Sequence, residues 1–260
     1  MSVDRISFDS GGLFLAADVG NSSVKLSLWS CGRMVDSSRF SAGDADSIRA
    51  FLHGRRIDGA AMSSVGEGAA TLADTLRPYV ATGIMMVDKS VALPIKVSYR
   101  TPATLGVDRV CAAVGAAARE PGKWLVVVDA GTAVTVDVVS CSGEYAGGDI
   151  APGIGLQLDA LHRHTSRLPQ VEPEGELPSW GVDTETAIRC GVVRGVGALV
   201  ADTARSVERM SGERTVVFIT GGDASLVEHV VAGQEFECHV VPELVGLGLN
   251  AIYNYNLKQK

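Results

Sequence analysis

Hydrophobic and polar residues alternate along the first part of the chain in a pattern typical of antiparallel strands. Three such runs, at residues 13–19, 23–30 and 33–40, follow one another with short turns between them. Amphipathic segments then alternate with apolar runs of strand length. The predicted helices are 44–54 and 68–80, and the predicted strands are 57–65 and 83–88.

The same order of patterns begins again at Trp124. Residues 124–140 are predicted to form a second hairpin, followed by a helix and by strands at 215–222 and 236–242. The longest predicted helix, 184–210, has an apolar face, and its pair of glycines in a GxxxG pattern (Gly191 and Gly195) favours close packing between lobes or between subunits. Residues 168–181 contain three prolines and are predicted to be a surface loop.

This repetition predicts the fold class. Strands that can pair in antiparallel fashion, followed by alternating helices and strands, indicate an α/β protein with mixed sheets flanked by helices. Because the order occurs twice, we expect two lobes, residues 1–118 and 119–260, with the active-site cleft between them. Such a layout is typical of two-lobed phosphotransferases.

Composition narrows the class of partner. The 260 residues are 46% hydrophobic and 20% charged, which is ordinary for a globular protein. The net charge of −7 argues against nucleic-acid binding, although a small anionic substrate remains compatible with it. The five cysteines are scattered, so neither a disulfide framework nor a structural zinc site is predicted. With no signal-peptide pattern and no apolar run of membrane-spanning length, we expect a cytoplasmic protein.

Each predicted hairpin has Asp-x-Gly at its tip. In "DVGNSS" (18–23), Gly20 would let the backbone approach a phosphate group, and Lys25 would add a positive charge. Asp18 cannot bind an anion, but it could hold Mg²⁺ beside nucleotide phosphates. The alternative interpretation is a tight β-turn, which these residue types also favour.

The second tip, "DAGTAVTVD" (129–137), repeats the arrangement. Asp129 could hold a cation, and Gly131 with Thr132 could contact a phosphate group. Asp137 is expected on the exposed face of its strand. Farther along, the paired glycines of "TGGDA" (220–224) would permit a flat ligand against the backbone; the alternative is a strand-to-helix turn in which Asp223 caps the helix.

A third element combines an acid and a base at a predicted helix start. In "TLGVDRVCAAVGAAA" (104–118), Asp108 and Arg109 open a helix of small residues. An aspartate there is often a cap or a partner of the helix dipole. Beside an arginine it could instead be a general base next to an anion clamp.

Taken in order, "DVGN", "LGVDR", "DAGTAVT", "GGDIAPG" and "TGGDA" resemble the motifs of the type III pantothenate kinases. That family belongs to the actin/hexokinase/Hsp70 superfamily, whose lobes are ribonuclease-H-like. The resemblance extends from Leu13 to about Tyr253. It implies transfer of the γ-phosphate of ATP to the 4′-hydroxyl of pantothenate, the first step of coenzyme A biosynthesis.

The resemblance also assigns roles to residues. Asp108 would be the catalytic base, and Asp129 would bind a monovalent cation, K⁺ or NH₄⁺, in addition to the Mg²⁺ that accompanies ATP. The pantothenate-binding residues would be Tyr99, Gly106, Val107, Asp108, Arg109 and Thr184. The ATP-binding residues would be Asp18, Val19, Gly20, Asn21, Ser22, Ser23, Val24, Lys25 and Thr132. Family members are dimers, so the resemblance implies a homodimer.

Some positions depart from the family pattern, and other functions stay open. Ser22-Ser23 stands where Thr-Asn is frequent, Arg167 is an added charge in "TSRLP", and Asp183 replaces a common asparagine. The rival interpretations are another small-molecule kinase of the superfamily and a nucleotide-binding regulator without catalysis. The presence of Asp108, Arg109 and Asp129 counts against the regulator.

Overall fold

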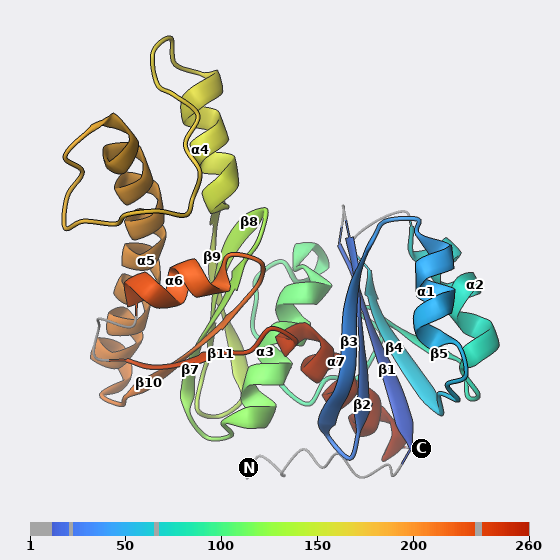
Figure 1. The fold of residues 1–260 in the computed structure, drawn as a ribbon. Coiled ribbons are helices and arrows are strands. Elements are labelled where there is room, and N and C mark those ends of the chain that lie inside the picture. Colours follow the sequence, from blue (N-terminus) through green and yellow to red (C-terminus); the bar gives the residue numbers. More distant parts are fainter. Residues whose placement is uncertain (1–11, 21–22, 65–67, 232–235, 260) are drawn as a thin grey trace. The chain divides into compact units, whose positions relative to one another are not determined.

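The computed structural model describes residues 12–20, 23–64, 68–231 and 236–259 (Figure 1). The chain forms two compact units. Unit 1 comprises Met1–Pro121, Ser142–Tyr145 and Glu243–Lys260, and unit 2 comprises Gly122–Cys141 and Ala146–Pro242. No helix in the described part of the chain is long and apolar enough to cross a membrane.

Unit 1 contains a five-stranded mixed sheet in the order β3-β2-β1-β4-β5. The first three strands are antiparallel, and β4 and β5 continue the sheet in parallel with β1. The strands are β1 (Leu13–Val19), β2 (Ser23–Ser30), β3 (Arg33–Ser41), β4 (Gly59–Ser64) and β5 (Ile84–Val87). The helices on one face are α1 (Ala45–Leu52), α2 (Ala69–Leu76) and the short η1 (Arg77–Tyr79).

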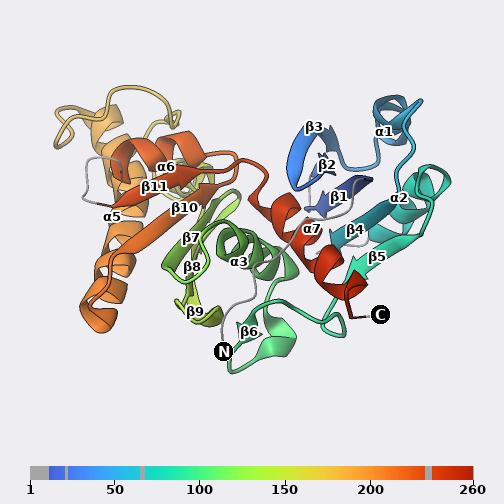
Figure 2. The ribbon, with the colours of Figure 1, turned by 90° about the horizontal axis from the view of Figure 1, so that it is seen from below.

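Alternation along β1 and β2 gives the sheet of unit 1 two different faces. Leu15, Ala17 and Val19 pack with α1 and α2 in one apolar core. On the other face lie α7 (Leu244–Leu257) and α3 (Val107–Arg119), which run side by side (Figure 2). A Cβ atom at Gly115 or Gly248 would collide with the backbone of the opposite helix, so the two glycines permit this close packing.

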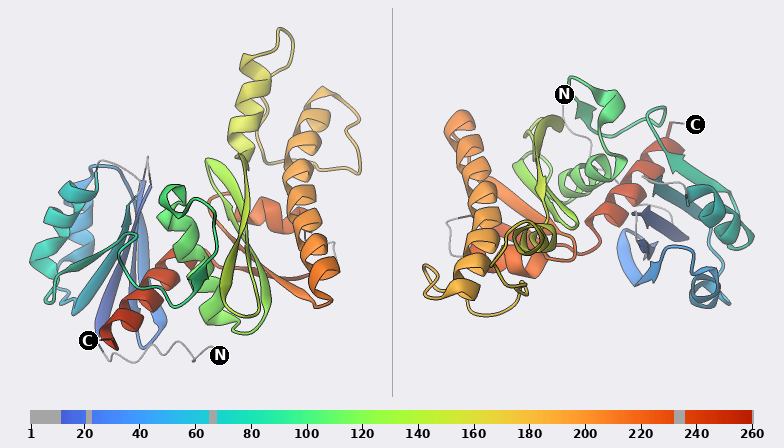
Figure 3. Two further views of the ribbon diagram at one scale, coloured as in Figure 1. Left: turned by 180° about the vertical axis from the view of Figure 1, so that it is seen from behind. Right: turned by 90° about the horizontal axis from the view of Figure 1, so that it is seen from above.

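Unit 2 repeats the strand order of unit 1. Five strands of a six-stranded sheet run in the order β11-β10-β7-β8-β9, with β7 and β8 antiparallel and with β10 and β11 parallel to β7. The strands are β7 (Trp124–Ala130), β8 (Ala133–Val139), β9 (Glu144–Pro152), β10 (Thr215–Thr220) and β11 (Glu237–Val240). The helices are α4 (Ile154–Arg163), α5 (Thr184–Ser211) and α6 (Ala224–Val231). Figure 3 shows α4 beside α5, with the long 168–181 loop in the connection between them.

The residues that follow β5 in the chain also belong to unit 1. After β5, the chain forms β6 (Lys96–Val97) and the short η2 (Pro102–Thr104) before α3 begins. Strand β6 pairs in parallel with Glu144 and Tyr145, the first residues of β9, which are counted with unit 1.

The prediction of an α/β protein with two mixed sheets flanked by helices is confirmed. Two expectations about unit 2 are wrong. The pattern did not predict β9, and Asp137 is only 1% exposed because Gly148 of β9 covers it. A Cβ atom at Gly148 would lie 2.5 Å from Asp137 Oδ1.

The glycine pair of α5 lies away from the core of unit 2, and the compact units have other bounds than the predicted lobes. Gly191 and Gly195 lie on the exposed side of α5, opposite its packed valines. Unit 1 includes Glu243–Lys260, which the predicted boundaries give to the second lobe, because α7 packs on α3 and β1. Lobes at 1–118 and 119–260, with a cleft between them, stay a prediction.

Candidate active site

Asp18 stands at the end of β1 with its carboxylate held by a neighbouring strand. It is paired in register with Lys25 of β2 on one side and with Ser63 of β4 on the other. Ser63 is 1% exposed, and its hydroxyl donates a 2.8 Å hydrogen bond to Asp18 Oδ1. Burial raises the pKa of Asp18, and the hydrogen bond from Ser63 opposes that shift.

More charges gather around Asp18 from helices that are distant in sequence. The carboxylates of Asp108 on α3 and Glu243 before α7 also raise the pKa of Asp18, whereas Lys25 lowers it. Lys25 Nζ lies 3.3 Å from Glu243 Oε1. The pKa of the buried Cys111 thiol is raised well above its usual value by desolvation and by the charges of Asp18 and Asp108. Asp18 and Asp108 are therefore electrostatic neighbours.

The start of α3 carries four of the predicted pantothenate-binding residues, Gly106, Val107, Asp108 and Arg109. Gly106 is the N-cap of the helix, and the Asp108 carboxylate accepts a 2.9 Å hydrogen bond from the Arg109 amide. A Cβ atom at Gly106 would collide with Asp108 Oδ1, so this carboxylate position requires glycine there. Asp108 is thus not the cap, although it lies in the first turn, where a negative charge is favoured.

Arg109 and Tyr99 extend this cluster. Arg109 is 7% exposed, and its guanidinium carbon lies 6.0 Å from the centroid of the Tyr99 ring. The Tyr99 ring in turn meets the buried Tyr145 ring edge-on, with centroids 6.0 Å apart. An arginine held beside an aromatic ring presents an oriented donor group for an anion.

In unit 2, backbone oxygens and glycines surround the tip at Asp129. Gly221, after β10, has a φ of +98°, and a Cβ atom there would lie 2.6 Å from Asp129 Oδ1 and collide with the Ala130 carbonyl. A Cβ atom at Gly153 would meet the Gly131 and Thr132 carbonyls in the same way. The glycines therefore allow the backbone to pack closely against several oxygen atoms.

The hydroxyl beside Asp129 is directed elsewhere. Thr220 of β10 is the register partner of Asp129, as Ser63 is of Asp18. Its Oγ1 atom, however, donates to the Pro242 carbonyl at 3.2 Å. Three residues farther along the chain, the Asp223 amide donates to the Ala130 carbonyl at 2.9 Å. Burial, and to a smaller extent the charge of Glu174, raises the pKa of Asp223.

The two tips offer different donor sets to cations. Within the described residues, no three His, Cys, Asp or Glu side chains gather as a metal site. Asp18, with Asp108 near it, fits Mg²⁺, which prefers one or two carboxylates together with phosphate oxygens. Asp129 and the neighbouring carbonyls are oxygen atoms of the type that hard cations prefer, and the Ala130 and Thr132 carbonyls also accept backbone hydrogen bonds.

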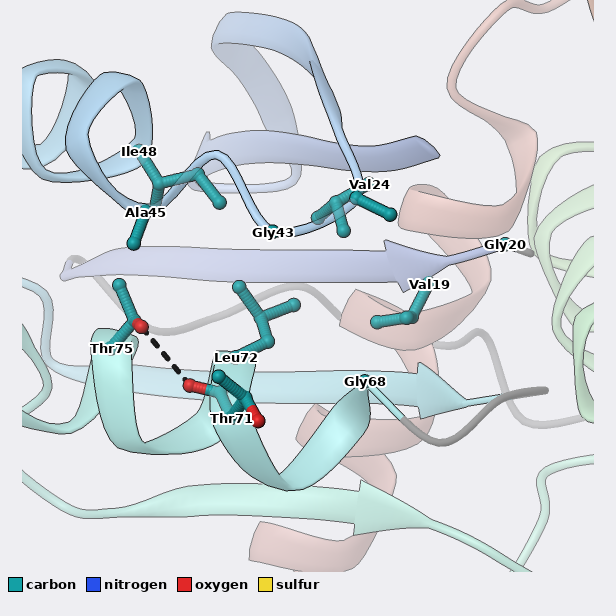
Figure 4. Close-up of a pocket in the computed structure, with 11 residues that line it drawn as sticks. Val19, Gly20, Val24, Gly43, Ala45, Ile48, Gly68, Thr71, Leu72 and Thr75 are labelled. Atoms are coloured by element: carbon teal, nitrogen blue, oxygen red, sulfur yellow. Dashed lines mark hydrogen bonds between the residues drawn. The ribbon is translucent and has the colours of Figure 1, made fainter. Parts of the chain in front are cut away.

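The opposite face of the first hairpin is apolar. A cavity of about 500 Å³ lies between the hairpin end and helices α1 and α2 (Figure 4). It is lined by Val19, Val24, Ile48 and Leu72, with the hydroxyls of Thr71 and Thr75. None of the described residues that line this cavity is ionisable, in contrast to the charged residues around Asp18.

Comparison with known proteins assigns the chain to a family. The model of the type III pantothenate kinases matches residues 14–206. A type III pantothenate kinase from Bacteroides fragilis strain YCH46 is 35% identical over 246 residues, which cover 93% of this chain and 98% of the relative. The chain belongs to the type III pantothenate kinase family.

Solved structures agree with this family in fold. A Campylobacter jejuni protein assigned to the Baf family of transcriptional activators has a TM-score of 0.63 at 21% identity, covering 94% of this chain and 99% of its own. A ROK family glucokinase from Streptomyces griseus has a TM-score of 0.52 at 12% identity, covering 94% and 99%. At these identities the likeness concerns the fold alone, with two ribonuclease-H-like lobes in the neighbours.

The structure brings some of the residues suggested by the family resemblance together. Tyr99, Gly106, Val107, Asp108 and Arg109 form one cluster in unit 1, and Asp18 with Lys25 lies close to its carboxylate. Thr184 and Thr132 belong to unit 2, where both are exposed. Asn21 and Ser22 lie outside the described residues. Asp183 caps α5 through a reciprocal pair of hydrogen bonds with Thr186.

Sequence reasoning missed Ser63 and Glu243. Ser63 belongs to a pair of hydroxyl residues at the end of an otherwise apolar strand, and Glu243 is an acid directly before an apolar helix. Both features are visible in the sequence, but neither indicates that Ser63 contacts Asp18 or that Glu243 contacts Lys25.

Proposed function

We propose that the chain transfers the γ-phosphoryl group of ATP to the 4′-hydroxyl of pantothenate, the first step of coenzyme A biosynthesis. Membership of the type III pantothenate kinase family supports the reaction. The observation that carries the assignment of residues is that the charge of Asp108 raises the pKa of Asp18, because a base and a phosphate-binding hairpin must be neighbours in a kinase.

In this proposal the first hairpin, Asp18 to Lys25, holds the ATP phosphates. Gly20 lets the backbone amides approach the phosphate oxygens, and Lys25 supplies a positive charge. Asp18, oriented by Ser63, would hold Mg²⁺ through its outer oxygen or a bound water. When bound, Mg²⁺ neutralises charge on the phosphate oxygens during transfer.

The start of α3 binds and activates pantothenate. Asp108 accepts the proton of the 4′-hydroxyl as the new bond to phosphorus forms. Arg109 holds the pantothenate carboxylate, and the Tyr99 ring limits the positions that the guanidinium can adopt. Thr184, with its exposed side chain, is proposed as a further pantothenate contact.

The second tip contributes a cation and a nucleotide contact. Asp129 and the adjoining carbonyl oxygens would bind K⁺ or NH₄⁺, and Thr132 would contact ATP. A bound ion would offset the cost of desolvating Asp129 in an apolar strand. We propose further that the enzyme is a cytoplasmic homodimer and binds neither nucleic acid nor membrane.

A coupled assay of ATP-dependent phosphorylation tests this function, with and without K⁺. We expect K⁺-dependent turnover of pantothenate and a fall of about 10²- to 10⁴-fold in kcat for Asp108→Asn. Asp46→Asn is the matched control, because Asp46 is also an aspartate in the first turn of a helix but pairs with Arg49 on the surface.

The outcomes separate the enzyme from its base. If Asp108→Asn keeps its turnover, the assignment as a kinase stands, and the assignment of Asp108 as the catalytic base is wrong. If the wild type binds ATP but does not phosphorylate pantothenate, the acceptor is a different molecule or the chain is a regulator.

A further inference from the structure

Glu243 is a buried acid that the proposed reaction does not use. It is the first residue of unit 1 after the chain leaves unit 2, and α7 begins at the next residue. Its carboxylate lies 3.3 Å from Lys25 Nζ, with side chains 9% and 20% exposed for the acid and the lysine. A pair this shielded from water keeps much more of its attraction than a surface pair.

The position of Glu243 is fixed by close packing of α7 on β2. Lys25, Ser27 and Trp29 alternate along β2 and so share one face. Gly246 follows Glu243 by three residues and lies against Ser27, where a Cβ atom would collide with the hydroxyl and approach Trp29 to 3.4 Å. The Leu247 amide donates to the Glu243 carbonyl at 2.9 Å, so Glu243 is held at the start of the first turn of α7.

Lys25 therefore has a carboxylate on each side. Asp18 is its partner in the β1–β2 register, where opposed side chains lie close, and Glu243 approaches from α7. The charges of both residues act on Asp18: Lys25 lowers the pKa of Asp18, and Glu243 raises it. If the ammonium group turned to Asp18, it would neutralise the carboxylate that Mg²⁺ needs. The ion pair with Glu243 counteracts that turn.

We infer that Glu243 is a positioning residue: its carboxylate holds the Lys25 ammonium group toward α7, which orients it for ATP phosphates and keeps Asp18 available to Mg²⁺. The inference rests on the proposed function, since it takes the hairpin 18–25 as the phosphate site. A purely structural ion pair would stabilise unit 1, and its loss would affect the KM values for Mg-ATP and pantothenate equally.

Steady-state kinetics of Glu243→Gln separate the two roles. The amide has nearly the same shape but no charge, so it binds the ammonium group less strongly than a carboxylate does. We expect KM for Mg-ATP to rise about tenfold, with a higher Mg²⁺ requirement and KM for pantothenate within about twofold of the wild type. Asp36→Asn is the control. Asp36 of β3 forms a 2.6 Å ion pair with Arg55, so this variant also removes one acid from an ion pair of unit 1, at a place outside the proposed site.

A double-mutant cycle tests whether the effect passes through Lys25. With Lys25→Met already in place, adding Glu243→Gln should change KM for Mg-ATP by less than about twofold. Independent, multiplied effects of the two substitutions would overturn the inference, and so would an unchanged KM for Mg-ATP in Glu243→Gln. An equal rise of both KM values with a lowered melting temperature would indicate the structural role.

Further arms keep the test decisive. If Glu243→Gln does not fold, Glu243→Asp retains the charge on a shorter side chain and should give an intermediate KM for Mg-ATP. Equilibrium binding of Mg-ATP is measured alongside. If the wild type binds Mg-ATP but does not phosphorylate pantothenate, the proposed function fails, while weaker binding by Glu243→Gln still supports the inference.

Discussion

The two Asp-x-Gly hairpins look alike in sequence and occupy the same place in their sheets, yet their surroundings differ. In both, the aspartate is the last residue but one of a central strand and is in register with a hydroxyl residue of the adjoining parallel strand. At Asp18, that hydroxyl belongs to Ser63 and binds the carboxylate. At Asp129, it belongs to Thr220 and binds the Pro242 carbonyl instead.

The other neighbours of the two aspartates also differ in kind. Asp18 is surrounded by charged side chains from α3, β2 and the start of α7. Asp129 is surrounded by glycines and backbone carbonyls. The comparison teaches that one repeated motif can have two different surroundings, because the elements packed around the tip decide which groups its carboxylate meets.

The largest expected difference between the tips is in catalysis. Asp18→Asn keeps the shape and the hydrogen bond from Ser63 but removes the charge for Mg²⁺, so we expect kcat/KM to fall about 10³-fold. Asp129→Asn should chiefly abolish activation by K⁺. Assays at a series of K⁺ concentrations measure both. If both variants lose K⁺ activation to the same extent, the tips do not have separate tasks.

The glycines at the two tips should differ in their effect on stability. Gly221→Ala places a methyl group against Asp129 and the Ala130 carbonyl at a φ of +98°, and we expect a loss of about 2–4 kcal/mol in the free energy of unfolding. For Gly20→Ala, the nearest atom of the described residues is the Ser23 carbonyl oxygen at 3.3 Å, and we expect a loss below about 1 kcal/mol. Urea denaturation measures both, and equal losses would contradict the crowded second tip.

The two hydroxyl residues provide a finer test. Ser63→Ala removes the group that orients Asp18, so KM for Mg-ATP should rise about fivefold. Thr220→Val removes a hydrogen bond to a carbonyl outside the proposed chemistry, so it should cost about 1 kcal/mol of stability and leave KM unchanged. A rise in KM for Mg-ATP in the threonine variant would show that both hydroxyls serve the site.

The smallest effect concerns the pH dependence of stability. The pKa of Asp18 is raised by burial in the folded state, above its unfolded value of about 3.9. From about pH 4 upward, through the folded pKa, the folded state binds more protons, so the free energy of unfolding falls as the pH rises. Asp18→Asn removes this contribution and should be the more stable form at neutral pH. Thermal melts across this range that remain parallel for both forms would contradict the burial of Asp18.

Local patterns predicted most of the elements but not the contacts of the site. The hairpins, α3 and α5 follow from alternation, helical periodicity and turn residues within one segment. Strand β9 was not predicted because its two adjacent glycines, Gly147 and Gly148, interrupt the apolar alternation. Its pairing with β8 in the sheet is a tertiary contact that a local pattern does not show. The exposure of Asp137 was predicted wrongly for the same reason.

The sequence by itself determined the order of elements, their repetition, the glycine-rich tips and the family to which the chain belongs. Only the tertiary structure decided that Ser63 meets Asp18, that Glu243 meets Lys25, and that Thr220 turns away from Asp129. These contacts depend on the register between parallel strands and on the return of α7 to unit 1. Such pairings form between segments that are distant in the sequence, so local structural preferences cannot predict them.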